Sequence, residues 1–152
     1  MNTILIEGAD HLGKSTLAGK FTAMEHKHLT RDDVADGRFD FCEGYFSLLE
    51  EGVVWDRFHL GSLVYGWCLG LHEVPFDLPR RLGVVDRELQ RRKVQLHVVY
   101  TSDEDWYERH LRENGKDELF SVKDIMQANR VFQAVAPPWA CLVDVKDGRW
   151  PS

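Results

Sequence analysis

The feature that most constrains this chain is the segment Gly8–Ser15, of sequence G-A-D-H-L-G-K-S, which joins two stretches of different periodicity. Before it, Thr3–Glu7 is a nearly continuous apolar run, which is typical of a strand buried on both faces of a parallel sheet. After it, apolar residues recur at spacings of three and four from Leu17 to Met24, which predicts a helix. The chain therefore opens with a strand, a glycine-containing turn and a helix.

The spacing of that turn, G-x-x-x-x-G-K-S, is the pattern of a phosphate-binding loop, or P-loop. Its two glycines let the backbone wrap round a phosphate, so that N–H groups of the turn and of the helix N-terminus point at the oxygens. Lys14 adds a charge for the β- and γ-phosphates, and the Ser15 hydroxyl is a ligand for Mg²⁺. The residues predicted to bind ATP are Gly8, Asp10, His11, Leu12, Gly13, Lys14, Ser15 and Thr16.

The rest of the chain alternates apolar runs with stretches long enough for helices. The runs are Val53–Asp56, Val94–Tyr100 and Cys141–Val145, with His28–Thr30 as a shorter further candidate. Helices are expected at about Phe39–Glu51, Leu60–Leu71, Pro79–Lys93, Asp103–Arg112 and Ser121–Ala136, with Asp103 and Ser121 as N-caps. This alternation predicts an α/β fold of three layers, α/β/α, around a mostly parallel five-stranded sheet.

Length and composition fit one domain spanning residues 1–152. The chain is 43% hydrophobic and 29% charged, which is ordinary globular usage. No stretch approaches the roughly 18 apolar residues of a membrane span, and no basic leader precedes the first apolar run, so we expect a cytoplasmic protein without a membrane partner, in the host cytoplasm if the protein is viral. Cys42, Cys68 and Cys141 are predicted to be reduced and buried. The oligomeric state is open, with a homodimer as one option.

A net charge of −6 argues against a surface that holds nucleic acid along its whole length. Local basic groups do occur, at Arg80, Arg81, Arg87, Arg91, Arg92 and Lys93, and again at Arg109, Arg112 and Lys116. Each group is either a solvated helix face or part of a local anion site.

A carboxylate and a guanidinium stand together where one apolar run ends, at Asp56 and Arg57. Because ligands of open α/β sheets bind at the carboxyl ends of the strands, this pair is expected beside the phosphates. Asp56 is a candidate for holding Mg²⁺ or orienting the acceptor, and Arg57 for clamping an anionic acceptor or the transferring group. The alternative is an ion pair in a surface turn.

These residues make the chain resemble the thymidylate kinase and deoxynucleoside kinase family of P-loop kinases. The opening Ile4–Gly8, with Asp10 and Gly13–Thr16, is similar to the family's E-G-x-D-x-x-G-K-S-T start. A second block, Asp56–Phe58 with Ser62 and Val64–Gly66, is similar to its D-R-[YFS]-x-x-S-x-x-[AV]-Y.

The resemblance implies roles for individual residues. Lys14 and Ser15 would serve ATP·Mg²⁺ and Arg57 the acceptor, while Arg109, Arg112 or Lys116 would contact the transferring phosphoryl group from a short lid near residues 103–120. Aromatic rings would stack on the acceptor base, the candidates being Phe41, Tyr45, Phe58 and Tyr65, although rings at helical spacing also serve as core. The resemblance also places His59 near the acceptor.

The chain departs from that family after its second predicted strand. Where thymidylate kinases carry R-E-P-G-G, this sequence has Thr30–Asp33, and Arg31-Asp32-Asp33 resembles the R-D-D of phage polynucleotide kinases. Carried over to Asp32, the role would be that of a general base for the acceptor hydroxyl. The alternative is a charged loop in which Asp33 caps a helix. The chain is also short for a thymidylate kinase, as in compact phage-type enzymes.

Three hypotheses follow. The first is a deoxynucleoside monophosphate kinase using ATP and Mg²⁺, favoured by Asp56-Arg57. The second is a kinase for a hydroxyl of a nucleoside, or of a modified base such as 5-hydroxymethyluracil or a 5′ end in DNA, favoured by Arg31-Asp32-Asp33. The third is a nucleotide-binding switch, which the absence of an N-K-x-D motif at Tyr100–Asp103 disfavours.

Overall fold

The computed structural model describes residues 1–114 and 120–149. The described part contains one five-stranded sheet in which every strand pair is parallel, in the order β2-β3-β1-β4-β5. The strands are β1 (Ile4–Gly8), β2 (Glu25–His28), β3 (Val53–Asp56), β4 (Gln95–Tyr100) and β5 (Cys141–Asp144). The order places β1, which leads into the phosphate loop, between β3 and β4, so the ends of all three strands meet at one edge.

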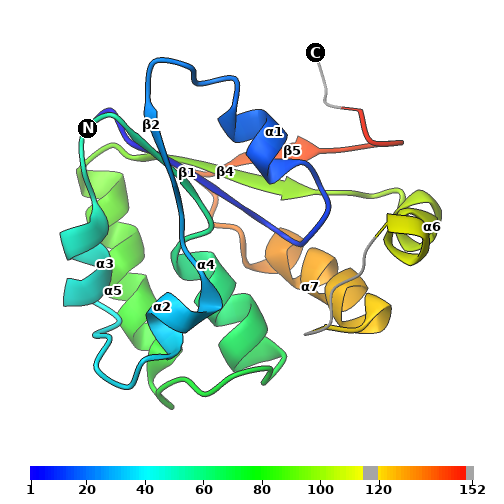
Figure 1. Ribbon diagram of the computed structural model, residues 1–152. Coiled ribbons are helices and arrows are strands. Elements are labelled where there is room, and N and C mark those ends of the chain that lie inside the picture. Colours follow the sequence, from blue (N-terminus) through cyan, green and yellow to red (C-terminus); the bar gives the residue numbers. More distant parts are fainter. Residues whose placement is uncertain (115–119, 150–152) are drawn as a thin grey trace.

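Helices flank this sheet on both faces (Figure 1). They are α1 (Lys14–Ala18), α2 (Arg31–Ala35), α3 (Glu43–Leu48), α4 (His59–Gly61), the π-helix η1 (Ser62–Cys68), α5 (Leu78–Arg91), α6 (Glu104–Asn114) and α7 (Val122–Val135). Helix α1 contacts β1 and β3 from one side, whereas α4 and α7 contact the sheet from the other. The predicted three-layer α/β fold is therefore confirmed.

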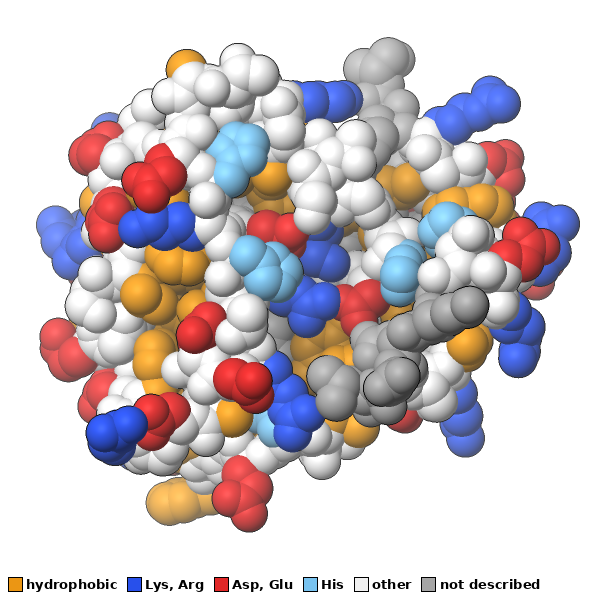
Figure 2. Space-filling model, viewed as in Figure 1, with side chains coloured by type: hydrophobic (Ala, Val, Ile, Leu, Met, Phe, Trp, Pro, Cys, Tyr) orange, Lys and Arg blue, Asp and Glu red, His pale blue; other side chains and the backbone are white. Residues whose placement is uncertain are grey.

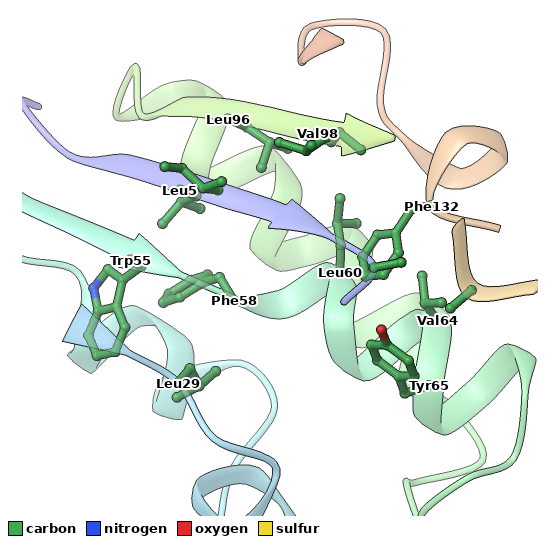
Figure 3. Packing of buried hydrophobic residues seen from close by; sticks show 14 of the residues in the cluster. Leu5, Leu29, Trp55, Phe58, Leu60, Val64, Tyr65, Leu96, Val98 and Phe132 are labelled. Carbon is green, nitrogen blue, oxygen red and sulfur yellow. The ribbon is translucent and has the colours of Figure 1, made fainter. Parts of the chain in front are cut away.

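The core is densest where helices cover both faces. All five residues of β1 and all four of β3 are buried, while the edge strands β2 and β5 are largely exposed. Below the sheet, Leu5, Phe58, Leu60, Val98 and Phe132 pack against one another (Figure 3). Fully burying one such side chain contributes about 1.5–3 kcal/mol, so the central strands form a rigid base for the residues at their ends.

Three predicted elements differ from those observed: two helices are shorter and one strand is shifted toward the N-terminus. The first helix ends at Ala18 rather than near Met24, with Gly19 as its C-cap. The strand expected at 28–30 ends at His28, because Thr30 and Asp33 form a capping box that starts α2 instead. The helix expected at 39–51 begins only at Glu43, where the Asp40 carboxylate accepts from the first N–H groups.

Other predicted boundaries are close to those observed. Ser121 caps α7 and accepts from the N–H of Asp124, and Asp103 accepts from the N–H of Trp106 in the first turn of α6, so both predicted N-caps are confirmed. The segment expected as one helix at 60–71 consists of the short helix α4 followed by the π-helix η1. A π-helix is wound more widely than an α-helix and is frequent at functional sites.

Two further observations concern the surface. Within residues 1–114 and 120–149, no helix has the length and apolar character needed to cross a membrane. Cys68 and Cys141 are exposed and Cys42 is half-buried, so the prediction of three buried thiols was wrong, although none of them forms a disulfide.

Candidate functional site

The turn after β1 has the backbone shape that its sequence predicts. Gly8 has φ 151°, and a Cβ at this position would lie 2.4 Å from the carbonyl oxygen of Val99, so a side chain has no room here. His11 (φ 60°) and Gly13 (φ 78°) then reverse the chain, while the buried side chain of Leu12 anchors the turn in the core. Helix α1 begins at the next residue, so its first N–H groups face the same hollow as the turn.

Lys14 lies inside this loop rather than in solvent. Its side chain is buried, and its Nζ donates to the carbonyl oxygen of Ala9 at 2.7 Å. Burial lowers the pKa of this ammonium, while the carboxylates of Asp56 and Glu7 act in the opposite direction. A buried ammonium with one backbone partner is suited to exchange that partner for a phosphate oxygen, because the negative charge of the phosphate offsets the cost of burying the ammonium.

A metal-binding geometry is present next to the lysine. The hydroxyl of Ser15 donates to Oδ2 of Asp56 at 2.9 Å, and Oδ1 of Asp56 is buried without a hydrogen-bond partner among the described residues. The imidazole Nδ1 of His28 is 3.5 Å from the same Oδ2. A hydroxyl and a carboxylate suit Mg²⁺, which takes few protein ligands and completes its shell with waters and phosphates. Both predicted metal ligands therefore lie together and fit the ion.

Arg57 stands between the phosphate loop and a neighbouring pocket. It has φ 74°, its guanidinium donates to the carboxylate of Asp10, and it lies over the ring of Tyr65 at 5.9 Å from the centroid. The backbone carbonyl of Asp10 accepts from the hydroxyl of Tyr107 on α6. Asp10 thus ties the loop to the pocket through its side chain and to α6 through its backbone.

A pocket lies beside Arg57, whose guanidinium is paired with Asp10 of the phosphate loop. Its lining combines basic groups, hydroxyls and aromatic rings, and consists of Leu29, Thr30, Arg31, Val34, Arg57, Phe58, Gly61, Ser62, Tyr65, His72 and Phe120. Tyr65 and Phe120 are stacked at 5.1 Å between centroids. Figure 2 shows this face hollowed at its centre, with basic and acidic side chains inside and histidines at the rim.

Two of the four predicted acceptor rings do not line this pocket. Phe58 and Tyr65 line it, but Phe41 is 5% exposed and Tyr45 fully buried in a cluster of rings with Phe39. The hydroxyl of Tyr45 is 2.6 Å from the Ser62 hydroxyl, and burial raises the pKa of Tyr45. Phe41, which precedes α3, and Tyr45, which lies within it, are both core residues.

The remaining predicted residues lie around the site rather than in it. Asp32 is exposed in the first turn of α2 and does not line the pocket, whereas its neighbour Arg31 does. Arg109 and Arg112 are exposed on α6, and Arg112 pairs with Glu108 at 2.8 Å. Lys116 lies outside the described residues. Thr16 is exposed in α1, and His59 is buried away from the pocket lining.

Sequence reasoning gave no site role to several residues of the pocket, among them Thr30, His72 and Phe120. These three come from three separate connections, and none belongs to a motif. The only available signal was the position of Thr30 next to Arg31.

Known proteins resemble this chain in structure and not detectably in sequence. No family model and no curated protein matches the sequence. The YorR protein of Bacillus subtilis, crystallised in complex with phosphorylated GDP, matches 93% of this chain and 85% of its own with a TM-score of 0.70 at 20% identity. Polyphosphate kinase 2 of Arthrobacter aurescens TC1 matches 92% of this chain and 59% of its own with a TM-score of 0.57 at 14% identity.

The chain has a P-loop NTPase-like fold. At these identities the likeness establishes the fold alone. Within the P-loop fold, the geometry described above supplies the local detail: a buried lysine in the loop, a serine hydrogen-bonded to an aspartate, and a pocket with basic and aromatic side chains beside them.

Proposed function

We propose that this protein is an ATP-dependent kinase that transfers a phosphoryl group to a deoxynucleotide, in the manner of a deoxynucleoside monophosphate kinase. The observation that carries the proposal is the position of Arg57. It directly follows Asp56, which is paired with Ser15 at the phosphate loop, and it also lines the neighbouring pocket. A donor phosphate on the loop and an acceptor in the pocket are then separated by about one side chain.

The charge of the pocket supports an anionic acceptor. Arg31 and Arg57 both line it, and no carboxylate belongs to its described lining. Arginine forks bind phosphate oxygens with paired hydrogen bonds. The rings of Phe58, Tyr65 and Phe120 add apolar surface suited to a base. The resemblance in fold to a protein described with phosphorylated GDP, and to a kinase, is consistent with phosphoryl transfer.

The mechanism requires positioning more than covalent chemistry from the protein. The acceptor oxygen attacks the γ-phosphorus, the bond to the β,γ-bridging oxygen breaks, and ADP leaves. Lys14 and the N–H groups of the loop hold the β- and γ-phosphates, and Arg57 orients the acceptor. Ser15 and Asp56 would hold Mg²⁺, which would supply positive charge to the phosphate oxygens.

The experiment is a screen of deoxynucleosides, their monophosphates and short DNAs for ADP release with ATP and Mg²⁺, with products identified by ³¹P NMR. We expect release to depend on a deoxynucleoside monophosphate and to disappear in Lys14→Ala, with exposed Lys123→Ala as the matched control. ATP hydrolysis that no acceptor accelerates would contradict the kinase assignment.

A hydroxyl acceptor is the second candidate, favoured by the position of α2. Arg31 lines the pocket and the exposed Asp32 follows it in the first turn of α2, so a carboxylate stands next to a lining residue, and the role of general base requires α2 to turn it toward the acceptor hydroxyl. In that case nucleosides or DNA accept phosphate, Asp32→Asn loses activity and exposed Asp105→Asn does not. A DNA acceptor would also bind less tightly as salt is added.

A further inference from the structure

Two buried ionisable side chains, Glu7 and His59, and the half-buried Asp86 form a row next to β1. Glu7, the residue before Gly8, is fully buried, and its Oε2 is 3.8 Å from Nδ1 of His59, which is 1% exposed. On the other side of the ring, Nε2 of His59 is 3.8 Å from Oδ1 of Asp86 on α5. Neither ring nitrogen has a hydrogen-bond partner within the described part of the chain. The function proposed above uses none of these three residues.

The carboxyl group of Glu7 holds the turn that follows β3. Its Oε1 accepts from the N–H of Phe58 at 2.9 Å, and its Oε2 accepts from the N–H of Leu60. Because both oxygens act as acceptors, the ionised form matches this arrangement best. Burial raises the pKa of Glu7, and the histidine and the two N–H groups oppose that rise. The ionised form therefore needs positive charge nearby.

His59 is placed to supply that charge. A neutral imidazole has one N–H donor and one lone pair, so with a carboxylate oxygen 3.8 Å away on each side its lone pair would face an oxygen. An imidazolium presents an N–H to both carboxylates, as an ion pair at this distance. The other polar groups around the row are Lys14, which faces Glu7, the hydroxyl of Tyr45, which is bound to Ser62, and the indole of Trp139, which donates to Oδ2 of Asp86 at 3.1 Å.

The turn that Glu7 holds is the one that carries Arg57. The N–H of Arg57 donates to the carbonyl oxygen of Ile6 at 2.9 Å, and the next N–H donates to Glu7, so residues 57 and 58 are bound to consecutive residues of β1. Arg57 adopts a positive φ there, which costs free energy unless its surroundings hold it. Loss of the Glu7 acceptor would release this turn.

We propose that His59 is a positioning residue, which as an imidazolium between Glu7 and Asp86 keeps the carboxylate that holds Arg57 beside the acceptor pocket. Its kinetic consequence rests on the kinase function proposed above. His59 and Asp86 also line a second pocket with Leu63, Pro79 and Pro137, separate from the acceptor pocket in its lining. This pocket gives the ring a route for proton exchange with solvent.

The first test reads the charge of the ring without any substrate. In protein labelled with ¹⁵N-histidine, the His59 nitrogens, assigned by their loss in His59→Gln, should both show the protonated shift at pH 7. Asp86→Asn keeps the acceptor for Trp139 but removes a charge, and should move the ring toward the neutral form. Glu88→Gln, on the same helix and paired with Arg91 and Arg92, should not. The proposal is overturned if the His59 ring is neutral in the wild type, or if its ¹⁵N shifts do not change in Asp86→Asn.

The second test reads the turn. In Asp86→Asn, hydrogen exchange at the N–H groups of Phe58 and Leu60 should be about tenfold faster than in the wild type at the same pH, as expected for loss of one charge-assisted hydrogen bond. The KM for the acceptor should rise by about the same factor while the KM for ATP stays constant. Unchanged exchange overturns the proposal even in an active enzyme. Should no acceptor be phosphorylated, the kinase assignment fails, while the ring shifts and the exchange rates still decide the role of His59.

Discussion

The phosphate loop and the acceptor pocket are neighbours that are built in different ways. The loop is a continuous segment, and the residues that shape it and act in it lie within a few positions of one another. The pocket is assembled from the end of β2, α2, the β3–α4 turn, η1, the following connection and Phe120 before α7. The difference teaches that the donor site is encoded locally, whereas the acceptor site depends on how distant segments pack.

Removal of the loop lysine should give the largest effect. Lys14→Ala should lower kcat/KM for ATP-dependent phosphoryl transfer by about 10²–10³-fold or more, the range for loss of one preorganised charged donor. The fold should persist, because the substitution removes a buried charge and leaves only the Ala9 carbonyl without its donor. Steady-state kinetics measures the loss of activity and thermal unfolding measures the stability, with Lys123→Ala as the control variant. A loss of less than about tenfold would mean that the loop does not hold the transferring phosphate.

Substitution of Arg57 should affect the pocket and spare the loop. Arg57→Lys keeps the charge but loses the planar fork, so the KM for the acceptor should rise by about 10–100-fold with little change in the KM for ATP. Exposed Arg87→Lys is the control. If the KM for ATP rises instead, Arg57 belongs to the donor site, and the division between the two regions is wrong.

Removal of the Tyr45 hydroxyl should distinguish core from pocket. Tyr45→Phe leaves the Ser62 hydroxyl without its 2.6 Å partner, which should lower the free energy of unfolding by about 1–2 kcal/mol. The KM for the acceptor should stay the same, since Tyr45 does not line the pocket. Denaturant unfolding and kinetics measure the two quantities. A raised KM with unchanged stability would return Tyr45 to the acceptor site.

The smallest effect should come from the ion pair between α6 and α7. Arg130 donates to both carboxylate oxygens of Glu104, at 2.6 and 2.9 Å, and thereby lowers the pKa of Glu104 below 4.5. The stabilisation from Glu104 is therefore present above pH 4.5 and is lost as the pH falls through the lowered value. Glu104→Gln should lower Tm by no more than a few degrees at pH 7, and less in high salt. A difference that persists at low pH would exclude this electrostatic origin.

Much of the fold could be predicted because its signals are local. Continuous apolar runs marked β1, β3, β4 and β5, and capping residues marked the starts of α6 and α7. The errors fell where short-range hydrogen bonds compete with periodicity. The Thr30–Asp33 box starts α2 where a strand was expected, and the Asp40 carboxylate delays the start of α3.

The same division applies to the candidate site. The residue types of Gly8–Ser15 were enough to predict a loop with Lys14 inside it, because positive φ angles and a close approach to Val99 require glycine at defined positions. The position of Asp56 beside the loop also followed, since parallel strands end at a common edge, and the structure adds its hydrogen bond with Ser15. By contrast, no sequence pattern separates the rings of Phe41 and Tyr45, which are core, from those of Phe58 and Tyr65, which line the pocket.

The sequence by itself determined that the chain forms a phosphate loop between a buried strand and a helix, because that geometry depends on residues next to one another. The tertiary structure alone decided which rings and arginines surround the acceptor pocket, and that the buried Glu7 and His59 form a row with the half-buried Asp86. Such sets depend on the packing of segments up to about 90 residues apart, as in Phe120 beside Leu29, and burial then sets the charges that these groups carry.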